Sequence, residues 1–162
     1  MAQEPLVVLS LELQGEAFAI PAGHVHEILD PVPVTEVPGA DPAVDGLINV
    51  RGRVVPLADL RLLFGMPQLQ AGADARIVVI EVEIDGDPVT IGIRADKVNE
   101  VTELAAASLE ATPRIGLRWD PDFITCIGKR NGTFVAVLDM GRIFSRLMHH
   151  AKAVAGAPAA AA

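Results

Sequence analysis

The sequence predicts a mostly β protein made of two small β-barrels that share an apolar interface, and three observations carry that prediction. Hydrophobic residues make up 51% of the 162 residues, but only 4% of the chain is aromatic and it contains no tyrosine. Valine, isoleucine, leucine and alanine therefore supply the apolar content, and the valine and isoleucine clusters favour strands. Short alternations of apolar and polar residues recur along the chain, and the whole pattern occurs twice.

The strands that open each half are predicted by a period of two. Apolar residues alternate with polar ones over residues 9–14 and again over 80–84, which is typical of half-buried strands. The glycine-centred stretches QGEA (14–17) and DGD (85–87) follow these strands, and such stretches favour tight hairpin turns. Each half therefore begins with a predicted hairpin.

An internal duplication sets the predicted architecture. Residues 7–29 resemble 77–101, and 46–64 align without gaps on 126–144. Each half has the content of a small barrel, five short strands and one helical segment. We expect a single domain over 5–147 with lobes at about 5–65 and 77–147, joined by a linker at 66–76. Because barrels of about 60–70 residues are marginal alone, the lobes are expected to bury a shared apolar surface.

The helical segments are predicted from their ends. Asp59 and Asp139 occupy N-cap positions ahead of LRLLF and MGRIFSRLMHH, and Gly65 follows the first segment as a C-cap residue. The alanine-rich tail at 151–162 either extends the last helix or stays without structure.

Charge and cysteine content exclude several function classes. The net charge of −8 argues against a phosphate-binding surface, so no nucleic-acid partner is expected, and it weakens a membrane-surface role. The single Cys126 suits a reducing compartment. No signal peptide or apolar run of membrane-spanning length is visible, so we expect a soluble, cytoplasmic protein without direct membrane insertion.

Residues for catalysis or metal binding do not converge in the sequence. His24 and His26 could share one face of a strand, but a metal site needs three or four ligands, and the neighbours His149 and His150 diverge on a helix. No nucleophile motif or nucleotide-binding glycine loop occurs. We therefore predict no catalytic residue, no metal and no cofactor. A small metal-dependent enzyme using His24 and His26 is kept as a distant alternative.

Residues 46–64, GLINVRGRVVPLADLRLLF, contain an arginine that their duplicate lacks. Arg51 falls on Asn131 and Asn49 on Lys129. Arg51 is either a solvated turn residue or a guanidinium held on a rigid hairpin for a carboxylate or a partner surface. Glu27, which recurs as Glu100, could pair with Arg51 if their strands adjoin.

The same residues carry a family resemblance. GLINVRGRVVPLADLRLLFG resembles the motif of the chemotaxis coupling (CheW-like) family, and the supporting motifs FAIPAGHVHEIL, IGIRADKVNEV and GKRNGTFVAVLDMGRIF occur in the right order along the chain. The resemblance covers about residues 5–147. It implies two five-stranded SH3-like barrels and a non-catalytic scaffold. Members bridge the cytoplasmic domains of chemoreceptors to the regulatory domain of the chemotaxis histidine kinase, in arrays at the inner face of the membrane.

The resemblance assigns site residues to the two partners. On the kinase side it implies Glu27, Gly46, Asn49 and Arg51 in the first barrel. A receptor-helix groove between the barrels is implied around Val78 and Gly92. Cys126 departs from the glycine that many members have. Coupling in a parallel system, such as twitching motility, is the alternative function.

Overall fold

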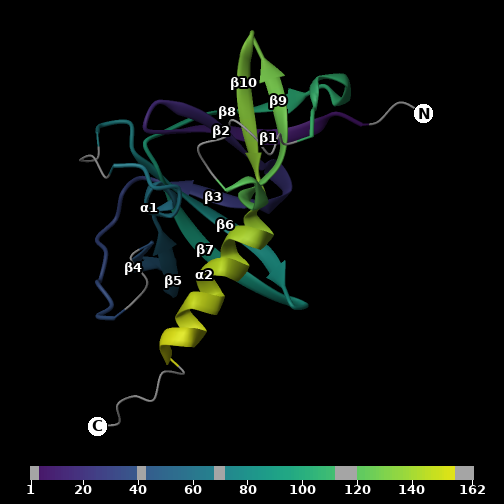
Figure 1. The fold of residues 1–162 in the computed structure, drawn as a ribbon. Coiled ribbons are helices and arrows are strands. Elements are labelled where there is room, and N and C mark those ends of the chain that lie inside the picture. Colours follow the sequence, from purple (N-terminus) through teal and green to yellow (C-terminus); the bar gives the residue numbers. More distant parts are fainter. Residues whose placement is uncertain (1–3, 40–42, 68–71, 112–119, 156–162) are drawn as a thin grey trace.

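Two curved five-stranded sheets make up the fold (Figure 1). The computed structural model describes residues 4–39, 43–67, 72–111 and 120–155, with the backbone alone for 148–155. One sheet, here sheet A, has the order β8–β1–β2–β10–β9, and the other, sheet B, has the order β3–β6–β7–β5–β4. The strands are β1 (Leu6–Leu13), β2 (Glu16–Pro21), β3 (Val25–Leu29), β4 (Val44–Val50), β5 (Arg53–Ala58), β6 (Arg76–Ile84), β7 (Asp87–Ala95), β8 (Lys97–Leu104), β9 (Ile124–Arg130) and β10 (Thr133–Leu138). The predicted mostly β class and the two five-stranded units are confirmed.

Each sheet takes strands from both halves of the chain. Sheet A combines β1 and β2 with β8, β9 and β10, whereas sheet B combines β3, β4 and β5 with β6 and β7. The expected lobes at 5–65 and 77–147 are therefore corrected, because β3 and β8 are exchanged between the sheets together with the hairpins that follow them. The short turn η1 (Ala22–His24) and the single residue Asp96 carry the chain from one sheet to the other. Part of the expected linker, 68–71, lies outside the described residues.

The duplication survives this exchange. Replacing every strand by its counterpart five places along converts the order of sheet A into that of sheet B. Equivalent turns share the same backbone, with φ of 51° and 53° at Gln14 and Asp85, and 52° and 49° at Arg51 and Asn131. The molecule therefore has an internal pseudo-twofold relation that allows each site to be compared with its counterpart.

The core has three parts, because several strands are apolar on both faces. On β6, Ile77 and Val79 face a small cluster inside sheet B, while Val78 and Ile80 belong to a large cluster with Leu9 and other residues of sheet A. A third cluster lies within sheet A. The expected apolar interface between the two units is therefore present as the large cluster.

The helices close the space between the sheets. Asp59 is the N-cap of α1 (Leu60–Leu63), and the N–H of Arg142 donates to Asp139 Oδ1 over 3.0 Å at the start of α2 (Met140–Ala155), as predicted. Gly65 follows α1 with φ +70°. Two further short turns are η2 (Ala106–Ser108) and η3 (Pro121–Phe123).

Helix α2 buries one face of its first two turns and then extends past the sheets (Figure 1). It contributes Met140, Ile143, Phe144 and Leu147 to the large cluster. Residues 151–155 of the alanine-rich segment extend this helix, and 156–162 lie outside the described residues. In the part of the chain that the structure describes, no helix is long and apolar enough to span a membrane.

Candidate partner-binding surface

An ion pair joins the two edges of sheet B. Glu27 lies on the edge strand β3, and Arg51 lies in the turn that follows the opposite edge strand β4. The sheet curls until Arg51 Nε is 3.3 Å from Glu27 Oε2, with 82% of the arginine side chain exposed but only 17% of the glutamate. The predicted pairing is confirmed. The ion pair spans the gap between the two edge strands, and the guanidinium of Arg51 faces solvent.

The backbone at Arg51 is in the left-handed region. Its φ is 52°, and Gly52 follows with φ 83°. Non-glycine residues other than asparagine and aspartate rarely adopt this conformation, which costs roughly 1–2 kcal/mol. At the equivalent position the second half has Asn131, which suits the conformation better. The turn itself therefore disfavours arginine, and a strained residue of this kind points to a role for its side chain.

Asn49 supports the turn that holds Arg51. Its Oδ1 accepts a hydrogen bond from the N–H of Gly52 over 2.9 Å, an arrangement in which an asparagine side chain replaces a backbone acceptor. Lys129, its counterpart, has no acceptor atom on its side chain. Asn49 therefore positions the turn, whatever else its exposed side chain contacts.

Glycine is required at position 46 because the backbone of Thr35 lies against it. A Cβ atom there would lie 2.3 Å from the carbonyl oxygen of Thr35, and the glycine has φ +154°. Thr35 is held in place by two backbone hydrogen bonds with Leu47, of 2.9 and 2.8 Å. Gly46 is buried and shapes the edge of the sheet through its backbone.

A shallow apolar depression lies beside Asn49. Its volume is about 430 Å³, and it is lined by Val32, Pro33, Thr35, Leu47, Ile48, Asn49 and Val54. Val54 is 69% exposed and pairs with Asn49 across the β4–β5 ladder. Glu27, Asn49, Arg51, Val54 and this depression together form what we call the Arg51 surface. An exposed cation next to exposed apolar area is suited to binding another protein.

Val78 and Gly92 are not exposed. Val78 has no accessible surface and belongs to the large core cluster. Gly92 is buried, and a Cβ there would lie 3.2–3.3 Å from side-chain atoms of Ile48, Ile77 and Leu57. The expectation that these two residues line an open groove is corrected to this extent, because β6 and β7 are covered on both faces at these positions.

Sequence reasoning missed the counterpart of the Arg51 pair. Arg130 forms an ion pair with Glu100 across the edges of sheet A, so the second half does carry a guanidinium at this hairpin, one residue earlier than the alignment suggests. The available signal was the arginine immediately before Asn131. A second missed group is Arg61, whose position two residues after the N-cap Asp59 was the only sequence sign of a buried ion pair.

The two candidate metal ligands, His24 and His26, and the thiol of Cys126 do not form a metal or catalytic site with other residues that the structure describes. Within the described ranges, no three histidine, cysteine, aspartate or glutamate residues are arranged to hold a metal ion. His24 is half-buried and His26 is exposed. Cys126 is half-buried on β9, and burial raises the pKa of its thiol, which disfavours the reactive thiolate.

Comparison with known proteins shows the family of the chain. The family model described as "CheW-like domain" matches residues 7–148. The chain belongs to the CheW-like family. It is similar to the chemotaxis protein CheW of Bacillus subtilis, with 27% identity over 135 residues and 83% of each chain covered. It is also similar to the chemotaxis protein CheW of Helicobacter pylori, with 28% identity over 144 residues, 89% of this chain and 84% of the relative.

A solved structure and a more distant relative complete the comparison. The scaffolding protein TtCheW from Thermoanaerobacter tengcongensis aligns with a TM-score of 0.75 and 27% identity, covering 84% of this chain and 90% of that one. Its likeness agrees with the two SH3-like barrels of this family. Protein PilI of Pseudomonas aeruginosa is 33% identical, but only over 73 residues, 45% of this chain and 41% of that protein.

Proposed function

We propose that this chain is a non-catalytic coupling adaptor of chemotaxis signalling that bridges chemoreceptor cytoplasmic domains to the regulatory domain of the chemotaxis histidine kinase. The family and the similarity to a scaffolding protein support the adaptor role. In this proposal the protein works in receptor arrays at the inner face of the membrane. The match to PilI is shorter and covers less of both chains, so coupling in a parallel system is the second candidate.

The kinase is assigned to the Arg51 surface. The single observation that supports this assignment is the strained, exposed Arg51 paired with a largely buried Glu27. A carboxylate or an aromatic ring of a partner can bind the exposed guanidinium without breaking a buried network. Val54 and the depression add apolar area beside it, as protein interfaces require near their centre.

The receptor helix is assigned to the region between the two sheets. Val78 and Gly92 shape the strands beneath this region and offer no exposed side-chain atoms for direct contact. An apolar stripe of a receptor helix would therefore contact the exposed rims of the sheets. Several weak contacts of this kind gain strength when many copies are held in an array.

Reconstitution tests this function. The full chain is mixed with the chemotaxis kinase and a receptor cytoplasmic fragment from one organism, and kinase autophosphorylation and co-sedimentation are measured. We expect the ternary complex to form only when the adaptor is present, with an increase in kinase activity. Unchanged kinase activity and no co-sedimentation with any cognate pair would contradict the proposal, and activity only with the kinase of a pilus-type system would favour the second candidate.

A further inference from the structure

The internal duplication allows a buried cation site in one half to be compared with an open pocket in the other. Asp59 and Asp139 are equivalent, and so are Gln14 and Asp85 in the matching hairpin turns. At the position two residues after the aspartate, the first half has Arg61 and the second half has Gly141. The two places are therefore equivalent in the fold, but Arg61 supplies a guanidinium in the first half where Gly141 has no side chain in the second.

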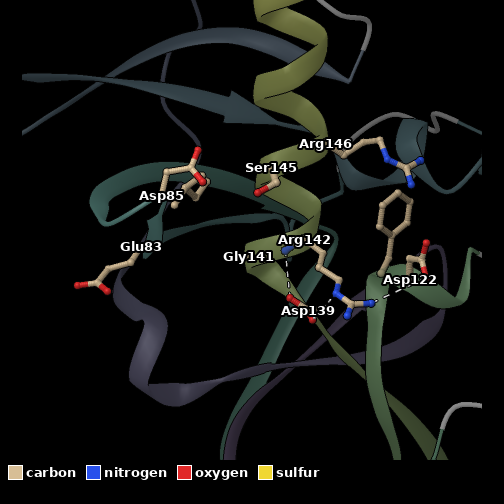
Figure 2. A pocket seen from close by; sticks show the side chains of 10 residues that line it. Glu83, Asp85, Asp122, Asp139, Gly141, Arg142, Ser145 and Arg146 are labelled. Carbon is tan, nitrogen blue, oxygen red and sulfur yellow. Dashed lines mark hydrogen bonds and ion pairs between the residues drawn. The ribbon is translucent and has the colours of Figure 1, made fainter.

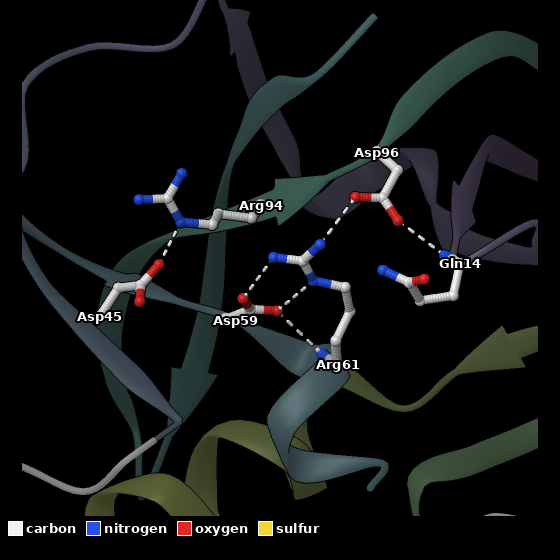
Figure 3. Close-up of polar contacts among 6 residues, drawn as sticks. All are labelled: Gln14, Asp45, Asp59, Arg61, Arg94 and Asp96. Atoms are coloured by element: carbon white, nitrogen blue, oxygen red, sulfur yellow. Dashed lines mark hydrogen bonds and ion pairs between the residues drawn. The ribbon is translucent and has the colours of Figure 1, made fainter. Parts of the chain in front are cut away.

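In the first half this place holds a guanidinium (Figure 3). Arg61 Nε and Nη2 donate to the two carboxylate oxygens of Asp59 over 2.9 and 2.7 Å, and Nη1 donates to Asp96 Oδ1 over 3.1 Å. Asp96 Oδ2 in turn accepts from the N–H of Gln14 over 2.6 Å. The hydrogen bonds to Asp59 raise the pKa of Arg61, so the guanidinium stays protonated. The network links sheet B to the β1–β2 turn of sheet A.

In the second half the same place is open (Figure 2). A pocket of about 670 Å³ lies at the start of α2, and its lining includes Glu83, Asp85, Asp122, Asp139, Gly141 and Arg142. Asp85 borders this pocket, just as its counterpart Gln14 borders the Arg61 network. The side chain of Asp139 is 31% exposed, whereas that of Asp59 is fully buried.

The two arginines that line the pocket do not form with Asp139 the bidentate hydrogen bonds that Arg61 forms with Asp59. Arg142 Nε is 3.6 Å from Asp139 Oδ2, and another nitrogen of the same guanidinium is 3.8 Å from Asp122, with 66% of the side chain exposed. Arg146 contacts Asp120 and stacks on the ring of Phe123. The pocket therefore keeps an excess of negative charge around a carboxylate that has no bidentate partner in the described part of the chain.

We propose that this pocket binds the guanidinium of an arginine side chain from another protein, in the place that Arg61 fills in the first half. The guanidinium would donate two parallel hydrogen bonds to Asp139, as Arg61 does to Asp59, and Asp85 and Glu83 would supply further negative charge. Arginine is favoured over lysine because only a planar fork can bond both carboxylate oxygens at once. The inference does not depend on the proposed function, since it concerns a different surface from the Arg51 surface.

The first experiment is an NMR titration of the ¹⁵N-labelled full chain with Nα-acetyl-L-argininamide. We expect saturable shifts at the amides of residues 139–142 with a dissociation constant on the order of 1–10 mM, the range for two charge-assisted hydrogen bonds in an open site. Nα-acetyl-L-citrullinamide, which has the same shape without the charge, should leave these amides unshifted. Equal shifts with both compounds, or no saturable shift with either, would overturn the proposal.

Two variants locate the site. Asp139→Asn keeps an oxygen that can cap α2 but removes the negative charge, so binding of the arginine amide should weaken at least tenfold; Asp30→Asn, which makes the same change outside the pocket, should leave it unaltered. Gly141→Arg copies the first half, and a Cβ there meets only Asp139 Oδ1 at 3.6 Å. It should abolish binding and raise the melting temperature by about 2–4 °C. Unchanged binding in Asp139→Asn or in Gly141→Arg would contradict the assignment.

Discussion

The two Arg–Glu pairs that close the two barrels occupy equivalent places but present opposite charges. In the Arg51–Glu27 pair the arginine is 82% exposed and the glutamate 17%, whereas in the Arg130–Glu100 pair the arginine is 26% exposed and the glutamate 61%. The backbone that supports them is the same, and the left-handed turn position holds Arg51 in one half and Asn131 in the other. The duplicated barrels have therefore diverged on their surfaces while keeping their fold.

This difference distinguishes the contact between the edge strands, which both barrels have, from the charge that each barrel exposes to a partner. Each pair spans the two edges of its sheet with either partner outward, so the contact across the edges does not explain which partner faces solvent. The first half adopts an unfavourable residue at the turn to present a cation. A surface chosen for binding is the simplest physical reason for that choice.

The largest expected effect comes from exchanging the residues at equivalent edge positions, Gly46 and Cys126. Gly46→Cys would place a Cβ atom 2.3 Å from the oxygen of Thr35, so it should lower the free energy of unfolding by at least about 2 kcal/mol. The reverse change, Cys126→Gly, should alter it by less than about 1 kcal/mol. Urea unfolding of both variants measures the two changes in the free energy of unfolding. Equal decreases would contradict the claim that only the Gly46 position excludes a side chain.

The next effect concerns the exposed charge itself. Arg51→Glu places two acids together and reverses the charge of the Arg51 surface, so kinase activation in a reconstituted receptor complex should fall at least about tenfold, or 1.4 kcal/mol. Arg53→Glu, in the same hairpin, is the matched control and should have a much smaller effect. Circular dichroism should show both variants folded. Full activation by a folded Arg51→Glu protein would remove Arg51 from the proposed kinase site.

A smaller effect tests the turn strain. Arg51→Asn gives the first half the residue of the second, and we expect the free energy of unfolding to rise by about 0.5 kcal/mol, because relief of the left-handed backbone outweighs the loss of an exposed ion pair. Asn131→Arg should lower it by about 1 kcal/mol. Chemical denaturation of the two variants is the measurement. Changes of the same sign would contradict the assigned strain.

The smallest effect concerns the thiol at Cys126. Burial raises its pKa in the folded protein, so the stability that the neutral thiol contributes is complete below the pKa of the unfolded chain, about 8.5, and is lost as the pH rises through the folded value. Alkylation by iodoacetamide near pH 8.5 should be severalfold slower in the native protein than in urea. Equal rates would mean that the thiol is not shielded.

Much of the fold could be predicted from sequence because local patterns determine it. The burial of Leu9, Leu11 and Leu13, the glycine turns and the N-cap Asp59 each depend on a few neighbouring residues, and all were confirmed, although Ser10 between the leucines is buried as well. The exchange of β3 and β8 between the sheets could not be predicted. In a duplicated chain the two barrels offer equivalent edges, so either pairing satisfies the same alternation.

The site was predictable only in part for a similar reason. Comparing the two halves drew attention to Arg51, but its pairing with Glu27 depended on whether their strands adjoin, which the sequence pattern allowed without showing. Val78 was misplaced because both faces of β6 are apolar, and sequence alone does not tell which face meets the shared core. The Arg61 network joins residues 14, 59, 61 and 96, and no local pattern links those positions.

The most direct test of the proposed kinase surface is the double variant Arg51→Glu, Glu27→Arg, measured for binding to the kinase regulatory domain by calorimetry. The exchange restores an ion pair across the barrel edges but replaces the exposed cation with an anion. We predict that the double variant folds as stably as the unmodified chain and binds as weakly as Arg51→Glu alone. Binding restored to the level of the unmodified protein would show that only the closed barrel matters, and would contradict the claim that the partner recognises the charge of Arg51.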